Sequence, residues 1–279
     1  MKKRICILFT IFSTFLTVSC EDAPVSSTKS CESEIIATVD TIEYEFGNCI
    51  VNYKNNNCTK LIIPDQSPHG IKINAIECID CPNVTEIVLP NSIEIIQASA
   101  FEKCPKLKII NWPNELKNID NSAFRYCTQL ESIKLPQNLT EISNYAFKGC
   151  SNIKEITFND SLTKIGYECF SKCRSLQSVR IKKTISNVDD GTFSFCSSLS
   201  EIIIEDGIKS LGSQCFQGCN IKKIFIPKTI EKINDNVFSD CPKDLTIYCE
   251  AEKQPSGYST YWNSDNHKII WNSKRSDVE

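Results

Sequence analysis

The sequence predicts a mainly β fold, a solenoid of 23-residue coils with a parallel sheet on its inner face and short strands and 3-10 turns elsewhere. Cysteines recur at a constant interval, and apolar residues occupy the same columns between them. No helix of ordinary length fits into such a unit beside its two strand-like segments. The interval is kept by Cys58, Cys81, Cys104, Cys127, Cys150, Cys173, Cys196 and Cys219, with Cys241 following after 22 residues.

The first half of each coil is a strand. Alignment on the cysteine produces the pattern C-x-x-L-x-x-I-x-L-P-x-x-I-x-x-I-x-x-x-A-F-x-x, which recurs in seven coils. The I-x-L segment, as at residues 133–135, has the period of two that is typical of a strand. Proline ends this strand because it cannot donate a hydrogen bond to a sheet, and it stands at Pro90, Pro113, Pro136 and Pro227.

The second half of each coil holds another short strand, of the LTEI type (139–142), and a tight A-F-x-x-C turn. One coil buries too few apolar side chains to offset the entropy of ordering its backbone. Stability must therefore come from the stacking of neighbouring coils. The phenylalanines that close the coils are Phe101, Phe124, Phe147, Phe170, Phe193, Phe216 and Phe238.

The L-x-x-I-x-L pattern, the proline after the strand and the A-F-x-x-C turn resemble the BspA-like leucine-rich repeat family of bacterial surface lipoproteins. The phrase IYCEAE…PSG…W after residue 246 resembles the C-terminal cap of its members, with Tyr258 where that phrase commonly has tryptophan. The resemblance implies an N-terminal cap (33–57), a leucine-rich repeat solenoid (58–244), and a C-terminal cap and tail (245–279).

The first residues favour export. A basic start is followed by an apolar run of 14 residues, Ile5 to Val18, which suits a signal peptide (1–19) and is short for a membrane span. Cys20 after a small residue resembles a bacterial lipobox, which implies lipidation at Cys20 and an envelope or surface location. Thr17 stands where that motif prefers leucine, so ordinary cleavage and secretion without a lipid remain an alternative. A polar, serine-rich stretch (20–32) is expected to be a flexible tether.

The repeat cysteines are expected to pack as small apolar side chains. Stacked coils would keep their Cβ atoms farther apart than a disulfide prefers. Cys78 and Cys81 form a C-x-x-C pair, but both fall into repeat columns, so we expect neither metal binding nor redox activity. Cys31 and Cys49 lie outside the ladder and are the better candidates for a disulfide.

The sequence offers no recognisable catalytic site, and we expect no enzyme activity, cofactor, metal or small-molecule substrate. It lacks the usual nucleophile, metalloprotease and phosphate-binding motifs. The two histidines, His69 and His267, are expected to be solvated loop residues. A formal net charge of −3 and the absence of a basic block with aromatics argue against nucleic acid as a partner.

The outward side chains of the I-x-L strands are the candidate partner-binding residues, because they differ between coils while the inward columns stay apolar. Four of them are apolar, which can mark a protein-binding patch, although β-branched residues also favour strands for their own sake. The set is Glu86, Val88, Ile109, Asn111, Ser132, Lys134, Glu155, Thr157, Ser178, Arg180, Glu201, Ile203, Lys223 and Phe225.

These observations predict a non-enzymatic binding module that is held at the envelope through a lipid anchor. The family resemblance implies adhesion to a host matrix or cell-surface protein. Two alternatives stay open: an accessory envelope protein of a glycan-degrading system, and a structural spacer.

Overall fold

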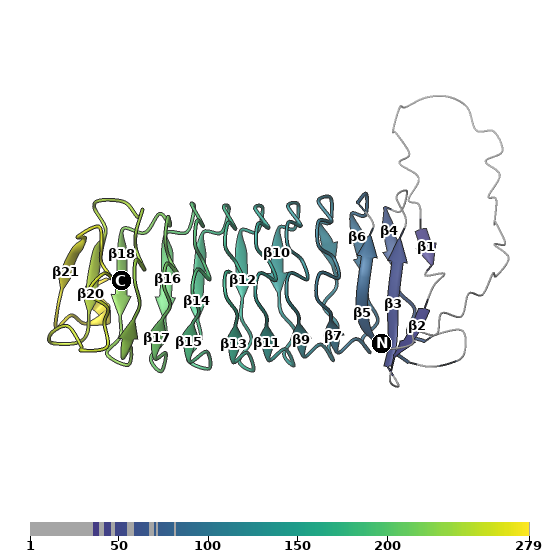
Figure 1. Cartoon of the computed structure of the whole chain (residues 1–279), viewed down its shortest axis with the longest axis horizontal. Coiled ribbons are helices and arrows are strands. Elements are labelled where there is room, and N and C mark those ends of the chain that lie inside the picture. Colours follow the sequence, from purple (N-terminus) through teal and green to yellow (C-terminus); the bar gives the residue numbers. More distant parts are fainter. Residues whose placement is uncertain are drawn as a thin grey trace, which may run out of the picture.

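The chain forms a rod of strands stacked coil upon coil, which confirms the predicted solenoid (Figure 1). The computed structural model describes residues 36–38, 42–45, 48–54, 59–66, 70, 72–80 and 82–278. Within them the one helical element is the 3-10 turn η1 (Arg275–Asp277). No helix in this part of the chain has the length and hydropathy that a membrane span requires.

The strands before the proline position form one side of the rod, here called the first-strand face. They pair in parallel, in three consecutive sheets. The first sheet contains β1 (Ile36–Thr38), β4 (Lys60–Ile62), β6 (Glu86–Val88) and β8 (Ile109–Ile110). The second contains β10 (Ser132–Lys134), β12 (Glu155–Thr157), β14 (Ser178–Ile181) and β16 (Glu201–Ile204). The third contains β18 (Lys223–Ile226), β20 (Thr246–Cys249) and β21 (Lys268–Ile270).

The strands after the proline position form a second sheet layer, the second-strand face. Most have only two residues, which confirms the short LTEI-type strand. One sheet contains β2 (Ile42–Glu45), β3 (Asn48–Lys54), β5 (Ile73–Asp80), β7 (Ile95–Ile96), β9 (Asn118–Ile119), β11 (Glu141–Ile142) and β13 (Lys164–Ile165). The other contains β15 (Asn187–Val188), β17 (Ser210–Leu211) and β19 (Lys232–Ile233).

The N-terminal end differs from the repeats because β2 and β3 pair as an antiparallel hairpin. Strand β3 then pairs in parallel with β5, with two register shifts. The backbone of Cys49 lies in β3, but Cys31 lies outside the described residues, so the Cys31–Cys49 disulfide stays a prediction. The predicted signal peptide and tether, with Cys20, also lie outside them, as do Cys58, Cys81 and His69.

The phenylalanine column forms the centre of the core. All seven rings are fully buried, and successive centroids are 5.0 to 5.9 Å apart. Trp262 closes the stack with an edge contact on Phe238 at 6.3 Å. Each ring contacts a ring from another coil, so this column couples the coils that could not fold singly.

The A-F-x-x-C turn requires two residues with left-handed backbone in each coil. In one turn these are Ser122 and Tyr126, with φ of 58° and 62°. One coil later Gly149 takes the second position with φ of 76°, and a Cβ there would overlap the ring of Tyr126. Gly149 therefore both relieves backbone strain and leaves room for an aromatic ring.

The repeat cysteines also act as hydrogen-bond donors, which the packing interpretation missed. The Cys127 Sγ lies 3.1 Å from the Phe101 carbonyl oxygen of the preceding coil, and Cys150 Sγ lies 3.1 Å from that of Phe124. The contact recurs through the column to Cys241. From Cys127 to Cys249 the described cysteines are free thiols. Burial raises the pKa of Cys150 and of Cys196 to about 12, so both remain protonated donors.

His267 ends this ladder, and its predicted place in a solvated loop is wrong. The residue is 6% exposed, and its Nε2 lies 3.1 Å from the Phe238 carbonyl oxygen. Because a carbonyl can only accept, Nε2 carries the proton. Asn263 holds the loop by bonding both the backbone N–H and the carbonyl of His267. His267 thus supplies the donor that a cysteine supplies in the preceding coils.

Candidate protein-binding face

The first-strand face carries the predicted binding residues, and the strand pleat decides which side chains point outward. Strands β10 to β16 alternate exposed and buried residues without interruption. The register pairs Ser132 with Glu155, and Arg180 with Ile203. Equivalent outward residues of successive coils therefore lie in rows across the sheet. The exposed members are Ile109, Asn111, Ser132, Lys134, Glu155, Thr157, Ser178, Arg180, Glu201, Ile203 and Lys223.

The middle of this face, β10 to β16, presents charges beside an apolar residue. Lys134 has no ion-pair partner among the residues that the structure describes. Arg180 lies 3.3 Å from the Glu205 carboxylate, and the backbone N–H of Lys183 bonds the same carboxylate. That N–H, together with Arg180, lowers the pKa of Glu205 despite its partial burial, so the glutamate stays ionised. Ile203 is 39% exposed within this row.

Asn111 is exposed but serves the fold. Strand β8 ends at Ile110, and the Asn111 side chain then bonds both backbone groups of Leu89, at 2.6 Å to N and 2.7 Å to O. The amide replaces the ladder that a longer strand would form. The first-strand sheets are interrupted between β8 and β10, and Ile109, 60% exposed, lies at this interruption.

Three of the predicted outward residues are not exposed. Glu86 and Val88 are half-buried, and Lys60 pairs with Glu86 at 3.1 Å. The prediction that Phe225 is a surface residue is wrong, because it is only 6% exposed. The Arg275 guanidinium lies over its ring, 4.8 Å from the centroid. Arg275 comes from the segment after the last strand, which returns to the first-strand face at β18 (Figure 1).

The repeat pattern that orders this face also identifies the family. The sequence pattern of the BspA type leucine rich repeat region, in six copies, matches residues 48–147 and 121–244. The chain belongs to this family. Among solved structures, the BspA-type chain is similar to a leucine-rich repeat protein of T. pallidum, with 28% identity and a TM-score of 0.58 over 62% of this chain and 81% of that one.

A second similar structure is a leucine-rich repeat protein from Bacteroides ovatus. It shares 25% identity with the BspA-type chain, and the TM-score is 0.61 over 84% of this chain and 70% of that one. No curated protein sequence matches the chain significantly. Family membership is consistent with a protein-interaction module, since leucine-rich repeat solenoids typically serve as binding scaffolds.

Neither a metal centre nor an enclosed pocket stands out in the described part of the BspA-type chain. It holds no group of three or more histidine, cysteine or acidic residues that could bind a metal ion. The described surface has open hollows of about 360 Å³, between Gly218 and Lys243, and of about 400 Å³, between Asp65 and Glu115. Neither is lined by residues of β10 to β16, the middle of the first-strand face.

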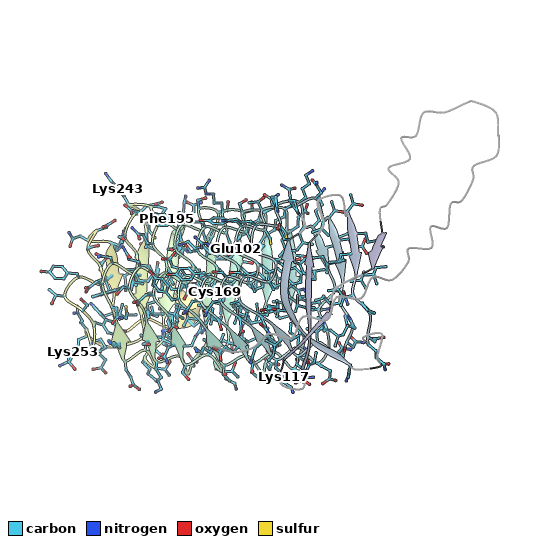
Figure 2. The ribbon with its side chains drawn as sticks, turned by 45° about the vertical axis from the view of Figure 1, so that its right-hand side comes forward. Glu102, Lys117, Cys169, Phe195, Lys243 and Lys253 are labelled. Atoms are coloured by element: carbon cyan, nitrogen blue, oxygen red, sulfur yellow. The ribbon has the colours of Figure 1, made fainter. Side chains whose placement is uncertain are left out.

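The second-strand face carries an ion-pair pattern that sequence reasoning missed. Lys117 lies 2.7 Å from Glu94, and Lys164 lies 2.7 Å from Glu141. Another pair, Lys209 with Glu231, lies at 2.6 Å. Opposite charges one coil apart in the alignment could have revealed these pairs. Each of these pairs links neighbouring coils on the second-strand face, as Arg180 and Glu205 do on the first-strand face. Figure 2 shows Lys117 among the side chains at the rim of the rod.

Proposed function

We propose that this chain is a non-enzymatic binding module whose first-strand face docks a host matrix or cell-surface protein. One observation carries the proposal. Four hydrogen-bonded strands hold eight outward side chains in register, and seven of the eight are polar or charged. These side chains differ between coils although the inward columns do not. A rigid sheet with a varied surface suits recognition of another macromolecule.

The proposal places the chain at the cell envelope or surface. Its support is the family together with the basic and apolar start of the sequence. Lipidation at Cys20 would anchor the solenoid to a membrane, with residues 20–32 as tether. Blocking lipoprotein processing with globomycin and measuring the mass of the N-terminal peptide tests this step. A mature peptide that begins at another residue, or that carries no lipid, contradicts it.

The face is tested on the chain from residue 21 to residue 279, captured on wells coated with solubilised extracellular matrix. One variant changes four exposed residues of β10 and β14 to glutamate: Ser132, Lys134, Ser178 and Arg180. We expect its half-maximal capture concentration to rise at least tenfold, because the added charges oppose docking. The new glutamates at 132, 178 and 180 face Glu155, Glu201 or Glu205 and should lower the melting temperature, so capture is measured at a temperature at which circular dichroism shows the variant folded.

The matched control makes the same change on the opposite face, at Thr163, Lys164, Ser186 and Asn187, all of which are exposed. Its capture should equal that of the unmodified chain. Equal capture by both variants would disprove docking on the first-strand face. Failure of the unmodified chain to bind matrix or cell-surface proteins would favour the structural spacer.

A further inference from the structure

We propose an arginine-binding site on the first-strand face, formed by Phe225, Ile204 and Asp206. Arg275 of the same chain occupies this site, and an arginine of a protein partner takes its place on binding. This inference rests on the proposed function and deepens it, since it names both a position on the face and the partner's chemistry. The site lies at the boundary between β16 and β18, beside the middle of the face.

The geometry around Arg275 is that of guanidinium recognition. The Phe225 ring lies against the planar group, with Cζ 4.8 Å from the centroid. The edge of the group donates from Nη2 to the Ile204 carbonyl oxygen and to Asp206 Oδ1, each at 3.0 Å. An aromatic face combined with acceptors at the edge suits arginine better than lysine, whose ammonium is a point charge without a plane.

The site exists because the sheet is interrupted. The second sheet of the first-strand face ends at β16, and the third begins at β18. The Ile204 carbonyl is therefore available to a side-chain donor. Phe225 follows Arg180 and Ile203 in the row of outward residues, so the ring lies where a partner on this face would reach it. Asp206 supplies the negative charge, and its side chain is 68% exposed.

The tail is held at this site almost entirely by Arg275. Ser273 is still anchored to Cys249 by a backbone bond. From Lys274 to Val278, the hydrogen bonds to the rest of the described chain all come from Arg275, and η1 contains no buried residue. The remaining bonds of this segment are internal, as between the Lys274 N–H and Asp277. A segment with one attachment can be displaced by a ligand that offers the same group.

The partner is therefore a protein segment that presents an arginine. Ile203 continues the apolar surface beside Phe225, so an apolar neighbour of that arginine would also be accommodated. The tail acts as a tethered competitor with an effective concentration in the millimolar range, and a ligand in trans must overcome it. Removing the Arg275 side chain should open the site without disturbing the coils.

The test uses the chain from residue 21 to residue 279 and a peptide probe with the tail's own sequence, acetyl-Ser-Lys-Arg-Ser-Asp-Val-amide. Binding is followed by chemical shifts of backbone amides in β16 and β18 in ¹⁵N-labelled protein. Arg275→Ala should show saturable shifts, and the unmodified chain should need at least fivefold more peptide for the same shift. Lys274→Ala removes the same charge from the same tail and should behave like the unmodified chain.

Two further measurements isolate the guanidinium. A probe with citrulline in place of arginine, which keeps the shape and loses the charge, should bind Arg275→Ala at least fivefold more weakly. Combining Arg275→Ala with Asp206→Asn should weaken binding of the arginine probe at least threefold. The inference is wrong if Arg275→Ala shows no saturable shift at 10 mM probe, roughly the ceiling expected for one side-chain contact, or if both probes bind equally.

These results are independent of matrix capture. Probe binding together with unchanged capture by the four-residue variant would overturn docking through the middle of the face and leave the arginine site standing. Loss of capture by that variant without probe binding would overturn the arginine site and leave docking through the middle of the face standing.

Discussion

Replacing Cys150 distinguishes a thiol that only fills space from one that also donates a hydrogen bond. Its Sγ is fully buried and lies 3.1 Å from the Phe124 carbonyl oxygen. The Phe124 carbonyl also accepts the N–H of Cys127, at 3.1 Å, so it keeps one partner when the thiol is lost. Cys150→Ala therefore loses a bond worth roughly 0.5–1.5 kcal/mol and leaves no orphaned carbonyl.

The small cavity left by the sulfur adds a further cost, so we expect about 1.5–2 kcal/mol for Cys150→Ala. Cys150→Ser keeps a donor at nearly the same place and should lose only about half as much. The predicted order of stability is Cys, then Ser, then Ala. If the thiol were merely a small apolar group, serine would be the worst of the three, because it would bury an unmatched hydroxyl.

The assay is urea unfolding of the chain from residue 21 to residue 279 under reducing conditions, followed by circular dichroism. An unchanged slope with a lower midpoint indicates lost stability rather than a changed unfolded state. For a chain of this size about 2 kcal/mol corresponds to a fall of roughly 4–8 °C in the melting temperature. An alanine variant that is as stable as the serine variant would refute the role of the thiol as a donor.

Three other predictions follow from buried groups. Burial raises the pKa of the Cys196 thiol from its ordinary value of 9.0 to about 12. Because the unfolded chain ionises first, the stability that this buried thiol contributes is fully present below about pH 9, and the urea midpoint should fall as the pH rises from 9 towards 12. A flat profile would contradict this. Gly149→Ala should lower the free energy of unfolding by about 1–3 kcal/mol, because the added Cβ strains the backbone at positive φ and overlaps the ring of Tyr126. Adding Tyr126→Ala to the same chain removes the overlap and should recover part of the loss. Asn159→Ala should lower the free energy of unfolding by about 2–4 kcal/mol in the same assay. The buried side chain bonds the carbonyl oxygens of Pro136 and Leu139 and the N–H groups of residues 161 and 162. A loss under about 1 kcal/mol would show that these bonds are dispensable.

Asn159 also shows how far reasoning from the repeat can reach. It stands where the pattern has proline, and the alignment marks it as an exception without a reason. In the structure its amide ties together the corner that proline forms in other coils. The departure was visible in the sequence, but its partners belong to the preceding coil and to the following turn.

The candidate binding face was largely predictable, because strand alternation alone decides which residues point outward. It failed at Glu86, Val88 and Phe225, and it did not reveal the structural role of Asn111. Asn111 bonds the backbone of Leu89, since β8 is too short to complete its ladder. Phe225 is covered by Arg275, which lies 50 residues later in a segment that no longer follows the repeat.

The sequence by itself determined the length of the coil and its inward columns, because both recur at one interval. It therefore determined the solenoid, since a repeated unit can bury its apolar side chains only by stacking on its neighbours. The tertiary structure alone decided that the thiols donate to phenylalanine carbonyls, that His267 ends their ladder, and that the tail returns to occupy the sheet. Each of these depends on the distance between atoms in different coils. Such distances follow from packing: the sequence shows the cysteine and phenylalanine columns, but not which carbonyl oxygen each thiol reaches.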